Sequence, residues 1–181
     1  MGDTDDLGAG IHQQVTGALQ PQLDWCDACD LVSVARRAVG DALAGRPVQV
    51  DIPAGLPLVR ADAVLMEQVL SNLLLNAARH TPPATPVRIM ARVTADGTQV
   101  ALAVADEGPG LAPELQGSLF QKFSRGAGAR AGGLGLGLSI VKGFMLAQGG
   151  DVAAGPGPAG GACFTVFLPH APHGAIPGDD H

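Results

Sequence analysis

The sequence predicts an α+β fold of two layers, in which helices cover one face of a mixed, mostly antiparallel sheet. First, stretches with helical spacing of apolar residues alternate along the chain with stretches of alternating polarity. Second, 46% hydrophobic and 15% charged residues in a chain of 181 provide for one packed core. Third, the 26 glycines and 14 prolines imply many turns, and the glycines have no three-residue period.

Three helices are predicted. The first spans 27–43, where apolar residues recur at helical spacing. The second spans 62–79, with Asp62 as a suitable N-cap and a His-Thr-Pro-Pro break after it. The third begins near Gly135 and ends at Gly149.

Alternating polarity predicts the extended segments, and Asp96-Gly97 between two of them is a strong hairpin turn. In chain order the segments are 47–53, 56–60, 86–95, 98–106, 151–155 and 161–168. The aperiodic ends lead us to expect a linker or tail over 1–26, the folded domain over 27–169 and a flexible tail over 170–181.

Composition argues against several classes of function. A net charge of −6 and a pI near 5.1 disfavour a nucleic-acid partner, which would need a basic face. There is no apolar run near twenty residues and no basic-then-apolar start, so neither membrane insertion nor secretion is indicated. Three cysteines do not make a disulfide framework. We therefore expect a cytoplasmic domain.

Three polar or glycine-rich clusters are candidates for chemistry. On helix 62–79, one face carries the polar residues Gln68, Asn72, Asn76 and Arg79, with His80 close by. This arrangement is either a plain solvent face or a set of amide oxygens for a hard cation such as Mg²⁺, with an arginine for phosphate.

The second cluster, Asp106-Glu-Gly108-Pro-Gly110, ends a strand. Here an aspartate could accept a hydrogen bond from an exocyclic amine such as adenine N6, beside glycines that allow close backbone approach. An ordinary Asp/Gly turn is the alternative.

The third cluster places Gly133, Gly135 and Gly137 where a helix begins. Glycines at alternate positions there expose N–H groups that suit phosphate. No Gly-Lys-Ser/Thr follows, so the cluster is not a P-loop.

The clusters occur in an order that resembles the catalytic domains of sensor histidine kinases. Residues 67–82 resemble their N box, 106–110 their first glycine box, 119–125 their F box and 133–140 their second glycine box. The upstream segment 43–60 further resembles the potassium-sensing Kdp-type kinases.

This resemblance, which covers about residues 47–168, implies the Bergerat fold of the GHKL proteins, shared with gyrase, Hsp90 and MutL, and binding of ATP with Mg²⁺. Asn76 would ligate Mg²⁺ with Asn72 in support, Asp106 would read adenine, and the second glycine box would surround phosphate under a lid formed by 121–134. The implied ATP-binding residues are Asn72, Asn76, Arg79, His80, Asp106, Gly108, Gly110, Phe120, Phe123, Arg125, Gly133, Leu134, Gly135, Leu136 and Gly137.

Two departures from the family pattern matter. Leu134 stands where a Thr or Ser is usual, so a hydroxyl contact to phosphate is absent. Asn72 stands where hydrolytic relatives have a Glu that activates water, which favours transfer over hydrolysis.

No histidine in the chain has the family's acceptor context, so we expect phosphoryl transfer to a histidine on a separate dimerisation domain, with a response regulator downstream. Isolated autophosphorylation is not expected.

Three other functions stay open. A serine kinase of the anti-sigma type would use the same ATP site, and so would a nucleotide-binding module without transfer. A thiol redox module would use the Cys26/Cys29 pair, through a thiol pKa lowered at a helix N-terminus.

Overall fold

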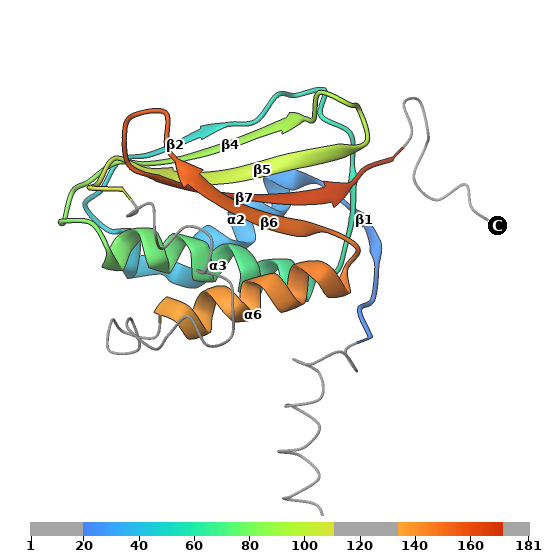
Figure 1. Cartoon of the computed structure of the whole chain (residues 1–181), viewed down its shortest axis with the longest axis horizontal. Coiled ribbons are helices and arrows are strands. Elements are labelled where there is room, and N and C mark those ends of the chain that lie inside the picture. The colour runs from blue at the N-terminus through green and yellow to red at the C-terminus, as the bar shows by residue number, and fades with distance from the viewer. Residues whose placement is uncertain (1–19, 111–133, 172–181) are drawn as a thin grey trace, which may run out of the picture.

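The computed structural model describes residues 20–110 and 134–171, and it has the predicted two-layer architecture. The described helices lie against one face of the larger sheet (Figure 1). The helices are α2 (Ala28–Val39), α3 (Ala63–Arg79) and α6 (Leu134–Ala147), with a 3₁₀ turn η2 (Gly40–Leu43) after α2. The strands are β1 (Asp24–Cys26), β2 (Val48–Asp51), β3 (Val59–Ala61), β4 (Val87–Val93), β5 (Gln99–Asp106), β6 (Asp151–Pro156) and β7 (Ala162–Pro169).

The larger sheet has five strands in the order β2-β4-β5-β7-β6. Only the β2–β4 pair is parallel, and the other three pairs are antiparallel. The β4–β5 register pairs Val87 with Asp106, so Asp106 ends its strand beside the start of β4. The sequence prediction of a mixed, mostly antiparallel sheet is confirmed.

Helix α3 lies at the centre of the core. Its predicted apolar face is buried as expected: Met66, Val69, Leu70, Leu73 and Ala77 are each at most 4% exposed. The Asp62 carboxylate caps the helix by accepting hydrogen bonds from the amides of Val64 and Leu65. Burial of this stripe therefore fixes which side of α3 is left for polar residues.

A buried polar contact joins α3 to α6. The side chain of Gln148, 2% exposed, accepts a hydrogen bond from the Asp62 amide at 2.8 Å and donates one to the Phe144 carbonyl at 3.0 Å. The end of α6 is thereby held against the start of α3, and the two helices run antiparallel side by side (Figure 1).

The structure differs from the sequence analysis at the ends of the domain. Strand β1 lies inside the segment 1–26 that we expected to be a tail, and it pairs with β3. His170, at the start of the expected C-terminal tail, forms a β-bridge with Val59. The folded domain therefore extends in both directions beyond the 27–169 that we expected.

The first predicted helix, 27–43, is divided in two. Gly40 has a φ of +47°, a conformation that ends α2 before η2 begins.

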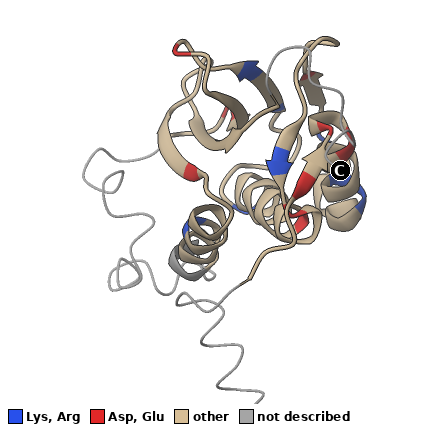
Figure 2. Cartoon of the chain, turned by 90° about the vertical axis from the view of Figure 1, so that its right-hand side faces the viewer, with Lys and Arg blue, Asp and Glu red and all other residues tan. Residues whose placement is uncertain are grey.

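Charged residues are sparse. In the view of Figure 2, Lys and Arg are scattered among Asp and Glu over strands and helices. Within the two described ranges, no helix combines the length and apolar character needed to cross a membrane.

Candidate functional site

The second half of α3 carries the first group of polar site residues. Asn72 and Asn76 are half-buried, one turn apart, on the side of α3 next to its buried stripe. Arg79 and His80 are exposed at the helix end. Within the part of the chain that the structure describes, neither asparagine amide has a hydrogen-bond partner, which leaves both free for a ligand.

The start of α6 lies toward the end of α3 that carries these amides. Gln148, just after α6, contacts Asp62, just before α3, and the two helices run antiparallel (Figure 1). The first turn of α6, whose N–H groups have no partner within the helix, is therefore on the same side of the domain as the second half of α3.

The third polar residue, Asp106, ends β5 and is only 6% exposed. Its Oδ1 atom accepts hydrogen bonds from the Gly108 amide at 2.9 Å and the Ala162 amide at 3.2 Å. Among the described residues, no hydrogen bond reaches Oδ2. One oxygen of this carboxylate thus fixes its orientation, and the other is left to accept from a ligand.

The backbone around Asp106 is packed too tightly for side chains. A Cβ atom on Gly161 would lie 2.0 Å from the Asp106 carbonyl oxygen, and one on Gly108 would lie 2.5 Å from Thr81 Cγ2. Gly110 has a φ of +84°, which disfavours other residues. These glycines allow the loop after β5, the β6–β7 turn and the end of α3 to pack closely around Asp106.

The end of α3 is held next to this loop by a buried cluster. Thr81, 8% exposed, donates a hydrogen bond to the Ala77 carbonyl at 2.6 Å and accepts one from Arg46 at 2.7 Å. Arg46 also donates to the carbonyls of Ala78 and Thr85. Because the Thr81 methyl faces Gly108, this cluster positions the helix end relative to Asp106.

An electrostatic interaction also links the end of α3 to the end of β5. Burial lowers the pKa of His80, and the charge of Arg79 lowers it further, whereas the Asp106 carboxylate opposes the shift. The net shift favours the neutral form of the His80 imidazole.

Other predicted site residues lie outside the described residues: Phe120, Phe123, Arg125 and Gly133. Leu134, Gly135, Leu136 and Gly137 form the first turn of α6. Of the predicted residues, the structure brings Gly108 next to Asp106 and, through Thr81, next to the end of α3. A common site that includes the start of α6 stays a prediction.

Sequence reasoning missed Gly161, Thr81 and Arg46. Gly161 had one signal, a glycine density in the β6–β7 turn greater than a hairpin needs. Arg46 had none, because its partners are more than thirty residues away.

The donor types suit a hydrated divalent cation with phosphate. Asn72 and Asn76 offer amide oxygens, a hard-cation ligand type, beside a helix start that suits anions. Within the described ranges, no group of three His, Cys, Asp or Glu residues is placed to hold a metal ion. A cation here would need the ligand's own oxygens as well.

Residues 61–172 match the family described as histidine kinase-, DNA gyrase B- and HSP90-like ATPases. The chain belongs to this family. Membership of this family implies binding of ATP.

Sensor proteins are among the similar curated proteins. The chain is 36% identical over 155 residues to the sensor protein KdpD of Escherichia coli, covering 85% of this chain and 17% of KdpD. It is 39% identical over 146 residues to the probable sensor histidine kinase TcrY of Mycobacterium tuberculosis, covering 77% of this chain and 30% of TcrY. The chain therefore spans less than a third of either relative.

Solved structures share the fold. A mycobacterial sensor histidine kinase, MprB, superposes with a TM-score of 0.69 at 24% identity, over 83% of this chain and 99% of that chain. Full-length ShkA in complex with AMPPNP superposes with a TM-score of 0.69 at 29% identity, over 86% of this chain and 33% of that chain. The expected Bergerat-type architecture is confirmed.

The cysteine pair does not have the environment that redox chemistry requires. Burial raises the pKa of the Cys26 thiol, and Asp24 and Asp62 raise it further. The pKa of Cys29 is also raised, by desolvation and then by Asp27 and Asp30. The lowered thiol pKa that the redox alternative needs is not found, because desolvation first and nearby carboxylates second raise both pKa values.

Proposed function

We propose that this chain is the ATP-binding catalytic domain of a sensor histidine kinase. It binds ATP with Mg²⁺ between α3, the loop after β5 and the start of α6. It then directs the γ-phosphoryl group to a histidine on a separate helical dimerisation domain. The family membership and the sensor-kinase relatives support the proposal.

The observation that carries the proposal is the state of Asp106. A buried carboxylate with one oxygen held by two backbone amides and the other free is a preorganised acceptor. An exocyclic amine such as adenine N6 has the donor that this free oxygen requires. Gly108 and Gly161 let their backbones pack against Thr81 and against Asp106, which holds the carboxylate in place.

The α3 amides face the phosphate end of the proposed ligand. Asn76 offers an oxygen to Mg²⁺, and Asn72 supports the metal or the phosphates. When bound, Mg²⁺ supplies positive charge that neutralises the phosphates. Arg79 adds a guanidinium at the same end of α3, and the neutral His80 lies against the nucleotide.

The chain positions ATP and leaves the nucleophile to its partner. The acceptor imidazole nitrogen bonds to the γ-phosphorus while the bond to the β–γ bridging oxygen breaks, its electron pair remaining on ADP, and the imidazole proton passes to solvent. Asn72 has no basic group with which to activate water, so transfer is favoured over hydrolysis.

The proposed partners follow from this chemistry. The first is a helical phosphoacceptor domain, on the same or another chain, and the second is a response regulator. We place the domain in the cytoplasm, where ATP is available. The identities to KdpD and TcrY are similar, so potassium sensing rests on the resemblance of segment 43–60 alone.

Calorimetric titration with a non-hydrolysable ATP analogue, with and without Mg²⁺, tests the proposal. We expect Asp106→Asn to weaken binding in both conditions. The Asn side chain can turn its N–H group toward the adenine amine, and two donors cannot form a hydrogen bond. Asn76→Ala should remove the part of the affinity that depends on Mg²⁺, at least about tenfold.

Gln68→Ala is the matched control, because Gln68 is exposed on the same helix. Unchanged Mg²⁺-dependent affinity in Asn76→Ala would refute the metal assignment. Absence of any binding to the unaltered chain would refute the nucleotide site itself.

A further inference from the structure

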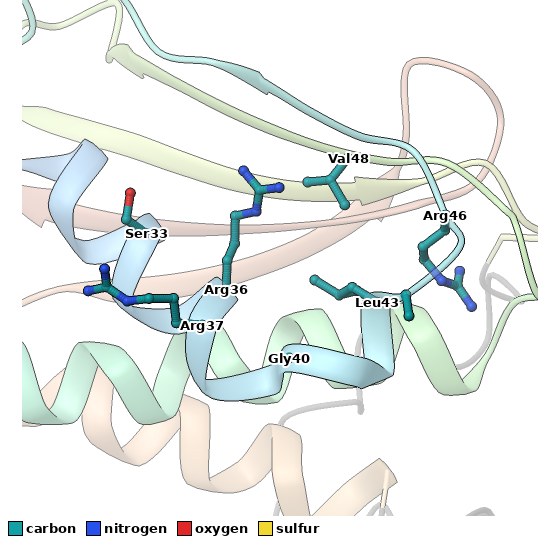
Figure 3. A pocket seen from close by; sticks show the side chains of 8 residues that line it. Ser33, Arg36, Arg37, Gly40, Leu43, Arg46 and Val48 are labelled. Carbon is teal, nitrogen blue, oxygen red and sulfur yellow. The ribbon is translucent and has the colours of Figure 1, made fainter.

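A groove unrelated to the nucleotide site lies at the edge of the larger sheet. It has a volume of about 490 Å³ and lies between the end of α2, η2 and strand β2 (Figure 3). We call it the β2-edge groove. Its lining residues are Ser33, Arg36, Arg37, Gly40, Leu43, Ala44, Arg46 and Val48.

The sheet side of this groove is an open strand edge, because β2 is the last strand of its sheet. The Pro47 carbonyl accepts a hydrogen bond from Val87 of β4. Since backbone groups alternate along a strand, the N–H and C=O of Val48 and Val50 point away from β4. Among the described residues, no strand pairs with this edge.

The helix side of the groove is basic. Within the described ranges, neither Arg36 nor Arg37 has an ion pair or hydrogen bond through its guanidinium, although the chain carries a net charge of −6. Figure 3 shows Arg36 extending from α2 toward Val48, whereas Arg37 extends along α2 in the opposite direction from Arg46. Arg46 is already bonded to the end of α3. Among the described residues that line the groove, none is a carboxylate.

We propose that the β2-edge groove binds an acidic, extended segment of a partner protein by strand addition. The main chain of the segment pairs with the free N–H and C=O groups of Val48 and Val50. Its carboxylates, on the alternate residues that face the helix layer, meet Arg36 first and Arg37 second. The two features together define a peptide site, since an open edge supplies affinity and side-chain contacts supply specificity.

The size of the edge explains why charge is needed. β2 has four residues and is bounded by Pro47 and Pro53, which restrict pairing beyond it. Backbone hydrogen bonds over so short a length give little net affinity. The unpaired arginines add charge-assisted hydrogen bonds and favour acidic segments over neutral or basic ones.

The test uses the full chain and a fluorescein-labelled peptide of alternating Glu and Val, followed by fluorescence anisotropy. We expect Arg36→Gln/Arg37→Gln to bind this peptide at least about tenfold more weakly. Arg92→Gln removes the same type of charge from exposed Arg92 on β4 and should leave binding unchanged. Unchanged affinity for the ATP analogue would show that each variant is folded.

Two further measurements test the strand pairing itself. A peptide with the same charges but N-methylated at alternate residues should bind at least about tenfold more weakly, because it lacks donors. In NMR titration, the amides of Val48 and Val50 should shift more than that of Gln49, which faces β4.

Each alternative result overturns the proposal. Equal affinity of the double variant for the peptide would show that Arg36 and Arg37 do not contact it. Equal binding of the N-methylated peptide would show a charge contact without strand addition. Absence of binding at millimolar peptide would exclude an acidic segment as the occupant.

Discussion

The contact between Gly108 and Thr81 gives a sharp test of how the site is assembled. A Cβ atom on Gly108 would lie 2.5 Å from Thr81 Cγ2 and 3.2 Å from Asp106 Oδ1. Thr81 has no easy way to move, because its hydroxyl is bonded to the Ala77 carbonyl and to Arg46. We therefore expect Gly108→Ala to separate the end of α3 from the loop after β5.

The expected loss of stability in Gly108→Ala follows from this overlap. Carbon atoms in ordinary contact lie about 3.5–4.0 Å apart, so the two groups must separate by roughly 1 Å or more. Overpacking of this kind costs about 1–3 kcal/mol. In a domain of this size, each kcal/mol lowers the Tm by about 2–4 °C. Affinity for the ATP analogue should fall as well, since the Gly108 amide orients Asp106.

Thr81→Ser supplies the rescue. It removes the methyl group that Gly108→Ala would meet and keeps the hydroxyl that both hydrogen bonds use. Alone it should cost about 0.5–1.5 kcal/mol for the lost buried methyl. Combined with Gly108→Ala, it should recover at least about 1 kcal/mol relative to the sum of the two single effects.

The assay is a double-mutant cycle by denaturant unfolding, with analogue affinity measured on all four proteins. Gly155→Ala is the matched control, since a Cβ on Gly155 would meet nothing within 4 Å. Strict additivity of Gly108→Ala and Thr81→Ser would refute the contact. So would a Gly108→Ala variant as stable as Gly155→Ala.

Four more predictions concern the polar groups that support the site. Because the pKa of His80 lies below its ordinary value of 6.5, the unfolded chain binds the proton first, and part of the stability is lost as pH falls below 6.5. Asp106→Asn should lower the pKa of His80 further in an NMR titration, and an increase would contradict the Coulombic link. Gln148→Leu should cost about 1–3 kcal/mol by leaving a buried amide unpaired, measured by denaturant unfolding, whereas Gln68→Leu on the exposed side of α3 should be nearly neutral. Arg46→Met should cost about 2–4 kcal/mol, since three oxygens lose a donor, and an unchanged unfolding midpoint would show that these hydrogen bonds contribute nothing net.

Local pattern sufficed to predict most of the fold. The buried stripe of α3 repeats at helical spacing, and the Asp96-Gly97 turn between β4 and β5 is a strong hairpin signal. Asp106 could be singled out because it ends a strand just before two glycines. Each of these features is encoded within about a dozen neighbouring residues.

The features that sequence reasoning missed depend on distant partners. β1 has three residues and no alternation of its own, and it is a strand because β3 lies beside it. Position 161 requires glycine because a Cβ atom there would lie 2.0 Å from the Asp106 carbonyl oxygen. Asp106 is 55 residues away in the chain. Such contacts have no periodicity, so a single sequence does not reveal them.

The polar bridges at the two ends of α3 suggest why so few groups suffice for the site. Gln148 holds the start of α3 to α6, and Arg46, through Thr81, holds its end to the loop after β5. The asparagines lie between these anchors. The same helix, α3, therefore positions both the phosphate end and the adenine end of the proposed ligand. Since phosphoryl transfer depends on positioning and charge neutralisation, a shift at either anchor should impair binding without touching the ligand. Analogue affinity should therefore fall in Gln148→Leu although Gln148 lies at the opposite end of α3 from Asn76.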